Sequence, residues 1–361
     1  MMLLPPAGPE REQWLDGLPQ GAAVFVVRLR EGRPHVGRTA LLGRRLRRLL
    51  SPGLCGALAS GVEYWPVASS LASSLQLYAV AREHYPDRYL QLIKLRMPAY
   101  VRVLLHQEFP RTAVTNRLSR IGLFFGPFRS RVAAEAFEVA VLEHFQVRRC
   151  AEELAPSPGH PGCMYGEMNQ CLRPCQAVVS AAEYRSEVRR LTEFLTTGGR
   201  SLAEVVEAAR DRLSAEMAFE EAARQHQRLE KIAATWRLRE ELAAPVDAAH
   251  GIAVTPAATR QAVELRLLMA GAWQPVEEIA ITPEAAAGQP VSLDRRLRER
   301  LERPLPAERP LTERQEHLAL LARWGYSSWR DGEWLPVEDW SRIPYRRLVN
   351  MVHRVATSER P

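Results

Sequence analysis

Four of the five cysteines lie close together in the middle of the chain, and this cluster constrains the structure of that segment more than any other feature. The residues between the first two, 155–162 (APSPGHPG), include three prolines and two glycines, which interrupt helices and strands alike. We therefore expect a loop with little hydrophobic core of its own. Four thiolates complete the inner coordination shell of tetrahedral zinc or of an iron–sulfur cluster. The predicted metal ligands are Cys150, Cys163, Cys171 and Cys175.

The spacing of these cysteines, C-x12-C-x7-C-x3-C, leaves the metal open. Structural zinc sites usually contain two short pairs, and only Cys171 and Cys175 form a short pair here. The fifth cysteine, Cys55, lies far away, and five cysteines are too few for a secreted disulfide scaffold. No apolar run approaches the ~20 residues of a membrane span, and the short, Pro-rich N-terminus is unlike a signal peptide. We therefore expect a cytoplasmic protein that does not contact a membrane.

The N-terminal part is predicted to form a β-hairpin followed by a helix. Residues 21–30 (GAAVFVVRLR) indicate a strand, residues 31–32 a turn, and residues 34–37 the start of a second strand. Residues 41–50 (LLGRRLRRLL) place their leucines on one face of a helix and their arginines elsewhere on its surface.

Arginine is concentrated in this same part of the chain. Residues 28–48 contain eight arginines and one glutamate, a pattern typical of a surface that contacts phosphates. A solvated basic helix face would give the same pattern and is the alternative. The residues predicted to bind DNA are Arg38, Arg44, Arg45, Arg47 and Arg48.

The middle of the chain indicates both helices and strands. Residues 73–86 are predicted to be helical, and the helix is expected to end before Pro86. Residues 89–105 alternate well enough for a pair of strands that turns at Met97-Pro98. Residues 133–145 predict an amphipathic helix, and residues 262–282 predict two strands.

Two C-terminal segments complete the prediction of secondary structure. A capping box at 201–204 (SLAE) opens residues 202–235, which we interpret as a helical hairpin or a nearly continuous helix with one apolar seam. A Pro-rich linker at 304–310 precedes a tail that contains four of the eight tryptophans. These tryptophans favour the core of a small helical subdomain over a surface that stacks on bases.

Several motifs in this order resemble the UvrC family, the nuclease subunit of the bacterial excinuclease. They are residues 163–175 (CMYGEMNQCLRPC), Glu183-Tyr184, residues 219–223 (FEEAA), residues 109–111 (FPR) and residues 125–128 (FGPF). The resemblance implies that the four cysteines hold a [4Fe–4S] cluster in preference to zinc. It also implies that the FEEAA segment belongs to a UVR module, which pairs with a like module of UvrB or of another UVR-containing protein. The implied partner-binding residues are Phe219, Glu220, Ala222 and Ala223.

The family's N-terminal catalytic unit is a GIY-YIG nuclease, in which two tyrosines and an arginine act on the scissile phosphate and a glutamate holds one divalent metal. By this resemblance the chain departs from the catalytic pattern, because phenylalanine and histidine replace the tyrosines and leucine replaces the glutamate. Without that carboxylate, bound Mg²⁺ or Mn²⁺ is not expected; Glu63 or Glu83 as a relocated carboxylate is the alternative. The matching positions are Phe25, His35, Gly37, Arg45 and Leu77.

The resulting prediction is an α+β protein that resembles a shortened UvrC, similar in size to the Cho branch of the family. Residues 236–361 offer neither the length of the family's RNase H-like nuclease nor the glycines of its helix-hairpin-helix pair. The expected domains are a degenerate GIY-YIG-like α/β domain at 17–105, a connector at 106–149, the four-cysteine segment at 150–185, a UVR helical module at 186–240, a β-containing region at 241–303 and a Trp-rich helical tail at 304–361.

Three functions remain open on this basis. The first is a UvrC-like DNA-binding protein of nucleotide excision repair whose GIY-YIG endonuclease is absent or crippled. The second is a Cho-like metal-dependent endonuclease that incises 3′ of DNA lesions with His35, Arg45 and a relocated carboxylate. The third is an adaptor that docks a UVR-containing protein through residues 202–235.

Overall fold

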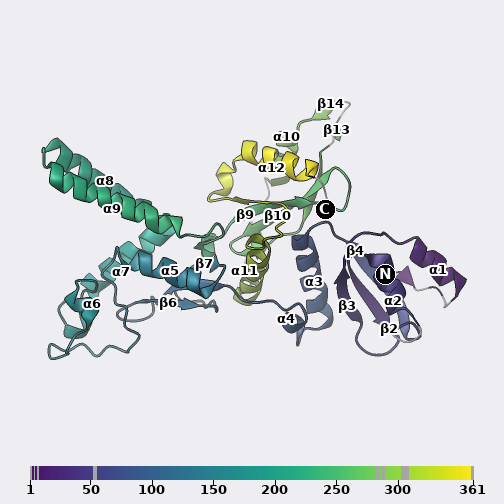
Figure 1. The fold of residues 1–361 in the computed structure, drawn as a ribbon, viewed down its shortest axis with the longest axis horizontal. Helices are drawn as coiled ribbons and strands as arrows, with labels where there is room; N and C mark the ends of the chain where they lie inside the picture. The colour runs from purple at the N-terminus through teal and green to yellow at the C-terminus, as the bar shows by residue number, and fades with distance from the viewer. Residues whose placement is uncertain are drawn as a thin grey trace.

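The protein combines helices with antiparallel sheets, which confirms the α+β class (Figure 1). The computed structural model describes residues 2–3, 5, 8–51, 55–281, 284–286, 289–301 and 309–358. Within these ranges no helix is both long enough and apolar enough to cross a membrane.

The N-terminal sheet has the strand order β1-β4-β2-β3, and helices cover both of its faces. The alternation of β2 explains this arrangement: Phe25 and Val27 pack with the leucines of α2, whereas Val24 and Val26 pack with α3. The predicted hairpin, turn and basic helix are confirmed, and Gly32 has the positive φ of 87° that the turn requires. The elements are β1 (Met2–Leu3), α1 (Pro9–Asp16), β2 (Ala23–Leu29), β3 (His35–Thr39), α2 (Leu42–Leu49), β4 (Ala59–Pro66) and α3 (Ser70–His84).

The predicted strand pair at 89–105 is wrong. Residues Tyr89–Leu92 form the short helix α4, and only β5 (Ala99–Val103) is a strand. A distant contact favours the helix, because the Tyr89 hydroxyl donates a hydrogen bond of 2.6 Å to Oε1 of Glu316. The partners of β5 are the later strands β6 and β7.

The middle sheet has the order β6-β5-β7-β8 and packs against α5 and α7. Its core is aromatic: the rings of Phe125 and Phe137 stack at 5.1 Å, and Trp236 lies 5.3 Å from Phe194. The helix predicted at 133–145 is confirmed as α5. The elements are β6 (Thr112–Thr115), β7 (Leu123–Phe128), α5 (Arg131–Leu142), α6 (Met164–Glu167), the 3-10 helix η1 (Pro174–Gln176), α7 (Ala181–Thr196) and β8 (Ala244–Pro245).

A long helical hairpin, α8 (Arg200–Ala215) and α9 (Phe219–Arg237), projects from the body of the molecule (Figure 1). The predicted hairpin is thus confirmed, but its predicted capping box is wrong. Ser201 lies inside α8, whose N-cap is Gly199 with a φ of 83°. The capping box of this region is instead formed by Ser180 and Glu183 at the start of α7.

The C-terminal sheet contains β11-β10-β9-β15, with β12 also paired to β10. Its two faces are covered by different helices: α10 and α12 pack on the side of Ile252 and Val254, and α11 packs on the side of Ala253. The elements are the 3-10 helix η2 (Val246–Ala248), β9 (Gly251–Pro256), β10 (Ala262–Met269), β11 (Ala272–Trp273), β12 (Glu277–Ala280), β13 (Glu284–Ala286), β14 (Gln289–Val291), α10 (Leu293–Leu301), α11 (Leu311–Gly325), β15 (Glu333–Pro336), the 3-10 helix η3 (Trp340–Arg342) and α12 (Tyr345–Thr357).

The tail is not a separate helical subdomain, because it is divided among several parts of the fold. Trp334 lies on β15, which pairs with β9 of the C-terminal sheet. Trp324 is buried on α11, whereas Trp329 is 85% exposed. Most of the linker predicted at 304–310 lies outside the described residues.

Helix α11 joins the N-terminal unit, the middle sheet and the C-terminal sheet. It contacts α3 of the N-terminal unit, β7 of the middle sheet and β11 of the C-terminal sheet. The buried Glu316 carboxylate accepts hydrogen bonds from the hydroxyls of Tyr78 and Tyr89, both at 2.6 Å. Leu320 of the same helix completes the core around α3. The position of the N-terminal unit therefore depends on α11.

Candidate functional site

The start of the cysteine segment is held by one buried arginine, Arg148. Its guanidinium donates hydrogen bonds to the carbonyl oxygens of Phe109 and Glu152, each at 2.8 Å, and to Oε1 of Gln107 at 3.1 Å. The same group lies 3.6 Å from Sγ of Cys150. A guanidinium with its donors satisfied by fixed acceptors orients this loop without a hydrophobic core.

Tyr184 connects the motifs at 109–111 and 183–184. Its buried hydroxyl donates to the Pro110 carbonyl and accepts from the backbone N–H of Arg148, both at 2.8 Å. The capping box of Ser180 and Glu183 fixes the first turn of the helix that carries this tyrosine. The two motifs thus hold the irregular segment that leads into Cys150.

The four cysteines differ in exposure but lie near one another. Cys171 and Cys175 are buried, Cys150 is half-buried and Cys163 is exposed. Burial, and after it the neighbouring cysteines, raises the pKa of Cys171 to about 11. Burial also raises the pKa of Cys175, with the other thiols adding to it. Arg173, in the left-handed conformation at φ 56°, turns the chain between them and its N–H points to Sγ of Cys171 at 3.4 Å.

Four neighbouring thiols form a donor set that suits zinc or an iron–sulfur cluster. All of them are free, and none is paired in a disulfide. Within the described parts of the chain, no three His, Cys, Asp or Glu side chains are arranged around one metal position. The residues that would hold a cluster are the four cysteines named above.

The N-terminal sheet brings four of the predicted catalytic positions together on the face covered by α2. Phe25 and Gly37 are cross-strand partners, and a Cβ at Gly37 would lie 2.9 Å from Cζ of Phe25, so only glycine fits beneath the ring. The His35 ring lies 5.9 Å from that of Phe25. Burial, followed by the nearby charge of Arg45, lowers the pKa of His35. Nε2 of His35 is buried and has no hydrogen-bond partner among the described residues.

Leu77 does not join this group. It lies on α3, against the opposite face of the sheet, and is 8% exposed in a cluster with Val26 and with Leu320 of α11. Glu63 is the cross-strand partner of Val26 and therefore shares that opposite face. Its carboxylate pairs with Nε of Arg28 at 2.7 Å, which lowers its pKa.

The arginines predicted to bind DNA fall into three groups. Arg44 and Arg48 are exposed on α2, with Arg45 half-buried beside them, and we call these three the α2 patch. Arg47 is ion-paired with Asp16 at 2.5 Å and with Glu12 at 3.5 Å. Arg38 lies on β3 near Arg323 of α11.

The hairpin presents part of its apolar seam to solvent. Ile232 is buried against the middle sheet, and Ala222 is buried within the hairpin. Phe219 is 65% exposed and Met217, in the turn, is 75% exposed. Of the other two predicted partner-binding residues, Glu220 and Ala223 are both exposed.

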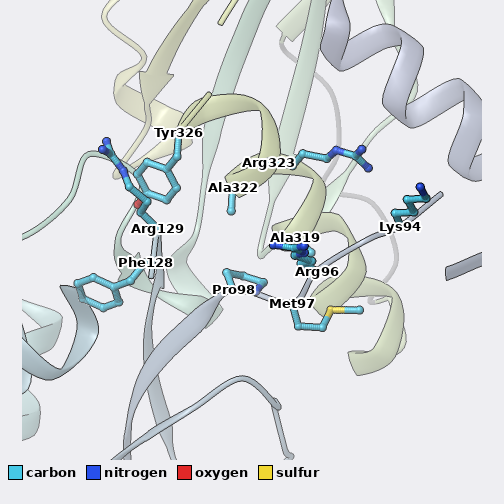
Figure 2. A pocket seen from close by; sticks show the side chains of 10 residues that line it. All are labelled: Lys94, Arg96, Met97, Pro98, Phe128, Arg129, Ala319, Ala322, Arg323 and Tyr326. Atoms are coloured by element: carbon cyan, nitrogen blue, oxygen red, sulfur yellow. The ribbon is translucent and has the colours of Figure 1, made fainter. Parts of the chain in front are cut away.

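Sequence reasoning missed a basic groove beside α11, shown in Figure 2. It has a volume of about 340 Å³ and carries the cations Lys94, Arg96, Arg129 and Arg323. These residues come from three segments far apart in the chain, so no single window of sequence contained the signal.

Comparisons with known proteins identify the middle of the chain. A sequence model of the middle domain of UvrC/Cho excinucleases matches residues 99–194. UvrABC system protein C of Syntrophotalea carbinolica is 37% identical over 133 residues, covering 36% of this chain and 21% of that protein. The protein of that name from Ruminiclostridium cellulolyticum is 28% identical over 195 residues, 51% of this chain and 32% of the relative.

A longer match has lower identity: UvrABC system protein C of Rickettsia rickettsii is 25% identical over 245 residues, 66% of this chain and 38% of the relative. The chain therefore spans about a third of the length of these curated relatives. No solved structure matches it. The matched segment, from β5 to α7, contains the motifs at 109–111, 125–128 and 183–184 together with all four clustered cysteines. On this evidence residues 99–194 are similar to the middle domain of UvrC/Cho excinucleases, and longer stretches of the chain are similar to UvrABC system protein C.

Proposed function

We propose that the protein is a DNA-binding member of the UvrC family that acts in nucleotide excision repair without a working GIY-YIG endonuclease. The observation that carries this proposal is the position of Leu77, the residue that stands where the family's metal-binding glutamate is expected. Leu77 is packed beneath α11, on the face of the sheet opposite Phe25 and His35. A divalent metal held at that position would be remote from the other catalytic positions.

The remaining groups support binding better than catalysis. Phe25 has no hydroxyl, and the lowered pKa of His35 keeps its imidazole neutral, so it is able to accept a proton. Glu63 is already paired with Arg28. Loss of the metal removes several kcal/mol of transition-state stabilisation, because no Lewis acid then offsets the charge that develops on the phosphoryl oxygens.

DNA binding is tested by reversing charge on the α2 patch. Arg44→Glu with Arg48→Glu should weaken binding of a labelled duplex by about tenfold or more at ~0.1 M salt, whatever its sequence. The control is Arg189→Glu with Arg212→Glu, which changes the same charge at exposed positions on α7 and α8. Equal affinities for the two double variants would contradict specific use of the patch.

Incision is tested separately with a lesion-bearing duplex in the presence of Mg²⁺ or Mn²⁺, with and without UvrB. We expect no nicking above background. Robust nicking that Arg45→Ala abolishes would overturn the proposal and favour the Cho-like endonuclease.

We also propose that the four clustered cysteines hold a [4Fe–4S] cluster, which would supply a rigid structural core for a loop that has none. The supporting observation is that Arg148 and Tyr184 fix one end of the loop while the buried pair Cys171 and Cys175 fixes the other. Protein purified without oxygen should be brown and absorb near ~400 nm. A colourless protein that contains one equivalent of zinc would contradict the iron–sulfur proposal and identify the site as a zinc site.

The exposed tip of the hairpin favours a second role as an adaptor for UvrB or another UVR-containing protein. Phe219 is an exposed aromatic side chain that offers an anchor to a partner helix. Phe219→Ala should weaken capture of such a partner by about 1 to 3 kcal/mol. Val132→Ala, which removes an equally exposed apolar side chain from α5, should leave capture unchanged.

A further inference from the structure

The groove beside α11 lies at the junction of the N-terminal unit, the middle sheet and the C-terminal region. Lys94 and Arg96 come from the connector between α4 and β5, and Arg129 follows β7. Arg323 comes from α11, as do Ala319 and Ala322, which form part of the floor. Figure 2 shows Lys94 and Arg323 towards one end, Arg96 near the middle, and Arg129 beside Tyr326 at the other end.

The charges of this groove are mostly uncompensated. Arg129 has an ion pair with Glu240 at 3.5 Å and lies over the Tyr326 ring at 5.4 Å. For Lys94, Arg96 and Arg323, no ion pair is found within the described residues. Arg323 is nevertheless fixed, since its guanidinium donates a hydrogen bond of 2.9 Å to the Ile93 carbonyl. Three of these four cations therefore have no ion pair within the described residues, and such a concentration of positive charge attracts a polyanion.

One further cation, Arg38 of the N-terminal unit, lies near Arg323 but outside the residues that line the groove. Arg38 on β3 lies close enough to Arg323 that its charge, after burial, lowers the pKa of that guanidinium. An anionic group between the two would remove this repulsion. The cations are spread along the groove, whose lining also includes the side chains of Met97 and Pro98, with Tyr326 beside Arg129 at one end. This spacing fits successive phosphates of a strand better than a single small anion.

We propose that this groove binds the phosphodiester backbone of DNA, along a path from Arg323 past Arg96 to Arg129. The inference rests on the proposed DNA-binding function and adds to it a second contact surface, distinct from the α2 patch. Because the groove is built from three parts of the fold, DNA bound there would contact all of them at once.

The test compares Arg96→Gln with Arg323→Gln, which removes two charges, and Arg96→Lys with Arg323→Lys, which keeps them. Affinity for a labelled duplex is measured by fluorescence anisotropy between ~50 and ~200 mM salt, with thermal unfolding as a check on folding. The glutamine pair should bind about tenfold more weakly and lower the slope of log K against log salt by roughly 1.8, the value for two lost phosphate contacts on a duplex. The lysine pair should stay within about threefold of the wild type, because phosphate accepts either cation.

The outcomes separate this inference from the proposed function. If the glutamine pair binds like the wild type while reversal of the α2 patch abolishes binding, the groove proposal is overturned and the DNA-binding function stands. If the wild-type protein does not bind duplex DNA at all, both fail. Pyrophosphate that competes at micromolar concentration, and only when Arg96 and Arg323 are present, would assign the groove to a small phosphate ligand and overturn binding of a DNA strand.

Discussion

The buried carboxylate of Glu316 ties the N-terminal unit to α11. Replacing it with leucine of similar size leaves the hydroxyls of Tyr78 and Tyr89 without their acceptor. Tyr78 is 5% exposed and cannot turn to water, although Arg82 still donates to its oxygen at 3.0 Å. Tyr89 is only half-buried, so water replaces part of its lost hydrogen bond.

The expected cost follows from these two environments. A buried hydroxyl that loses a charged acceptor costs about 2 to 3 kcal/mol, and a partly hydrated one costs about 1 kcal/mol or less. Glu316→Leu should therefore lower the free energy of unfolding by about 3 kcal/mol. Changing Tyr78 and Tyr89 to phenylalanine in the same chain should restore most of this loss, since no hydroxyl is then left unsatisfied.

Urea unfolding followed by tryptophan fluorescence measures both variants, and amide hydrogen exchange in α3 and α11 shows whether the junction itself opens. A loss below ~1 kcal/mol for Glu316→Leu would refute the reasoning, because the typical cost of two orphaned hydroxyls is larger. A triple variant as unstable as the single one would also refute it, since the cost would then come from packing and not from hydrogen bonding.

Three further predictions concern pH, the cysteine segment and the base of the hairpin. Burial lowers the pKa of His317 from its ordinary value of 6.5 to about 4. Between pH 6.5 and pH 4 this imidazole is therefore protonated in the unfolded chain but not in the folded protein. Stability should fall by up to about 3 kcal/mol as the pH drops through that window, and His317→Gln should flatten the pH dependence of urea unfolding. Cys171→Ser should lose the iron of the proposed cluster and lower the melting temperature, whereas Cys55→Ser should change neither; equal iron in both variants would argue against Cys171 as a ligand. Gly199→Ala places a Cβ 1.7 Å from Nε1 of Trp236 at a φ of 83°, while Gly198→Ala at φ 68° meets nothing within 4 Å. Gly199→Ala should lower the free energy of unfolding by roughly 3 kcal/mol or more, because backbone strain and steric overlap both act there. Gly198→Ala should lower it by about 1 to 2 kcal/mol, because only backbone strain acts there; urea unfolding measures both variants.

Local patterns predicted the parts of the fold that local physics determines. The β2–β3 hairpin and the basic helix α2 were predictable because alternation, a turn glycine and leucine periodicity all lie within a few residues. The capping box was predicted at the wrong serine because the pattern S-x-x-E occurs near the starts of two neighbouring helices, at 180–183 and at 201–204. Only the first begins a helix, since Gly199 already caps α8 before the second is reached.

The site was predictable only where its residues lie close in sequence. The four clustered cysteines lie within residues 150–175 and the arginines of the α2 patch within residues 44–48, so both groups are visible in a single window of sequence. Leu77 lies on the face of the sheet opposite Phe25 and His35 because α3 covers that face. The groove forms because α11 packs against a connector more than 200 residues earlier in the chain, as the hydrogen bond from Arg323 to the Ile93 carbonyl shows. Such contacts are set by tertiary packing, which a window of sequence does not contain.

The dependence of the N-terminal unit on α11 also bears on how the chain is made. Tyr78 and Glu316 are 238 residues apart, which at bacterial rates of roughly 5 to 20 residues per second separates their synthesis by roughly 10 to 50 s. During that interval the side of α3 that carries Leu77 and Tyr78 has no α11 to cover it. The N-terminal unit leaves the ribosome before α11 and completes its core only afterwards, so a chain stalled before residue 311 would keep that apolar surface open to solvent.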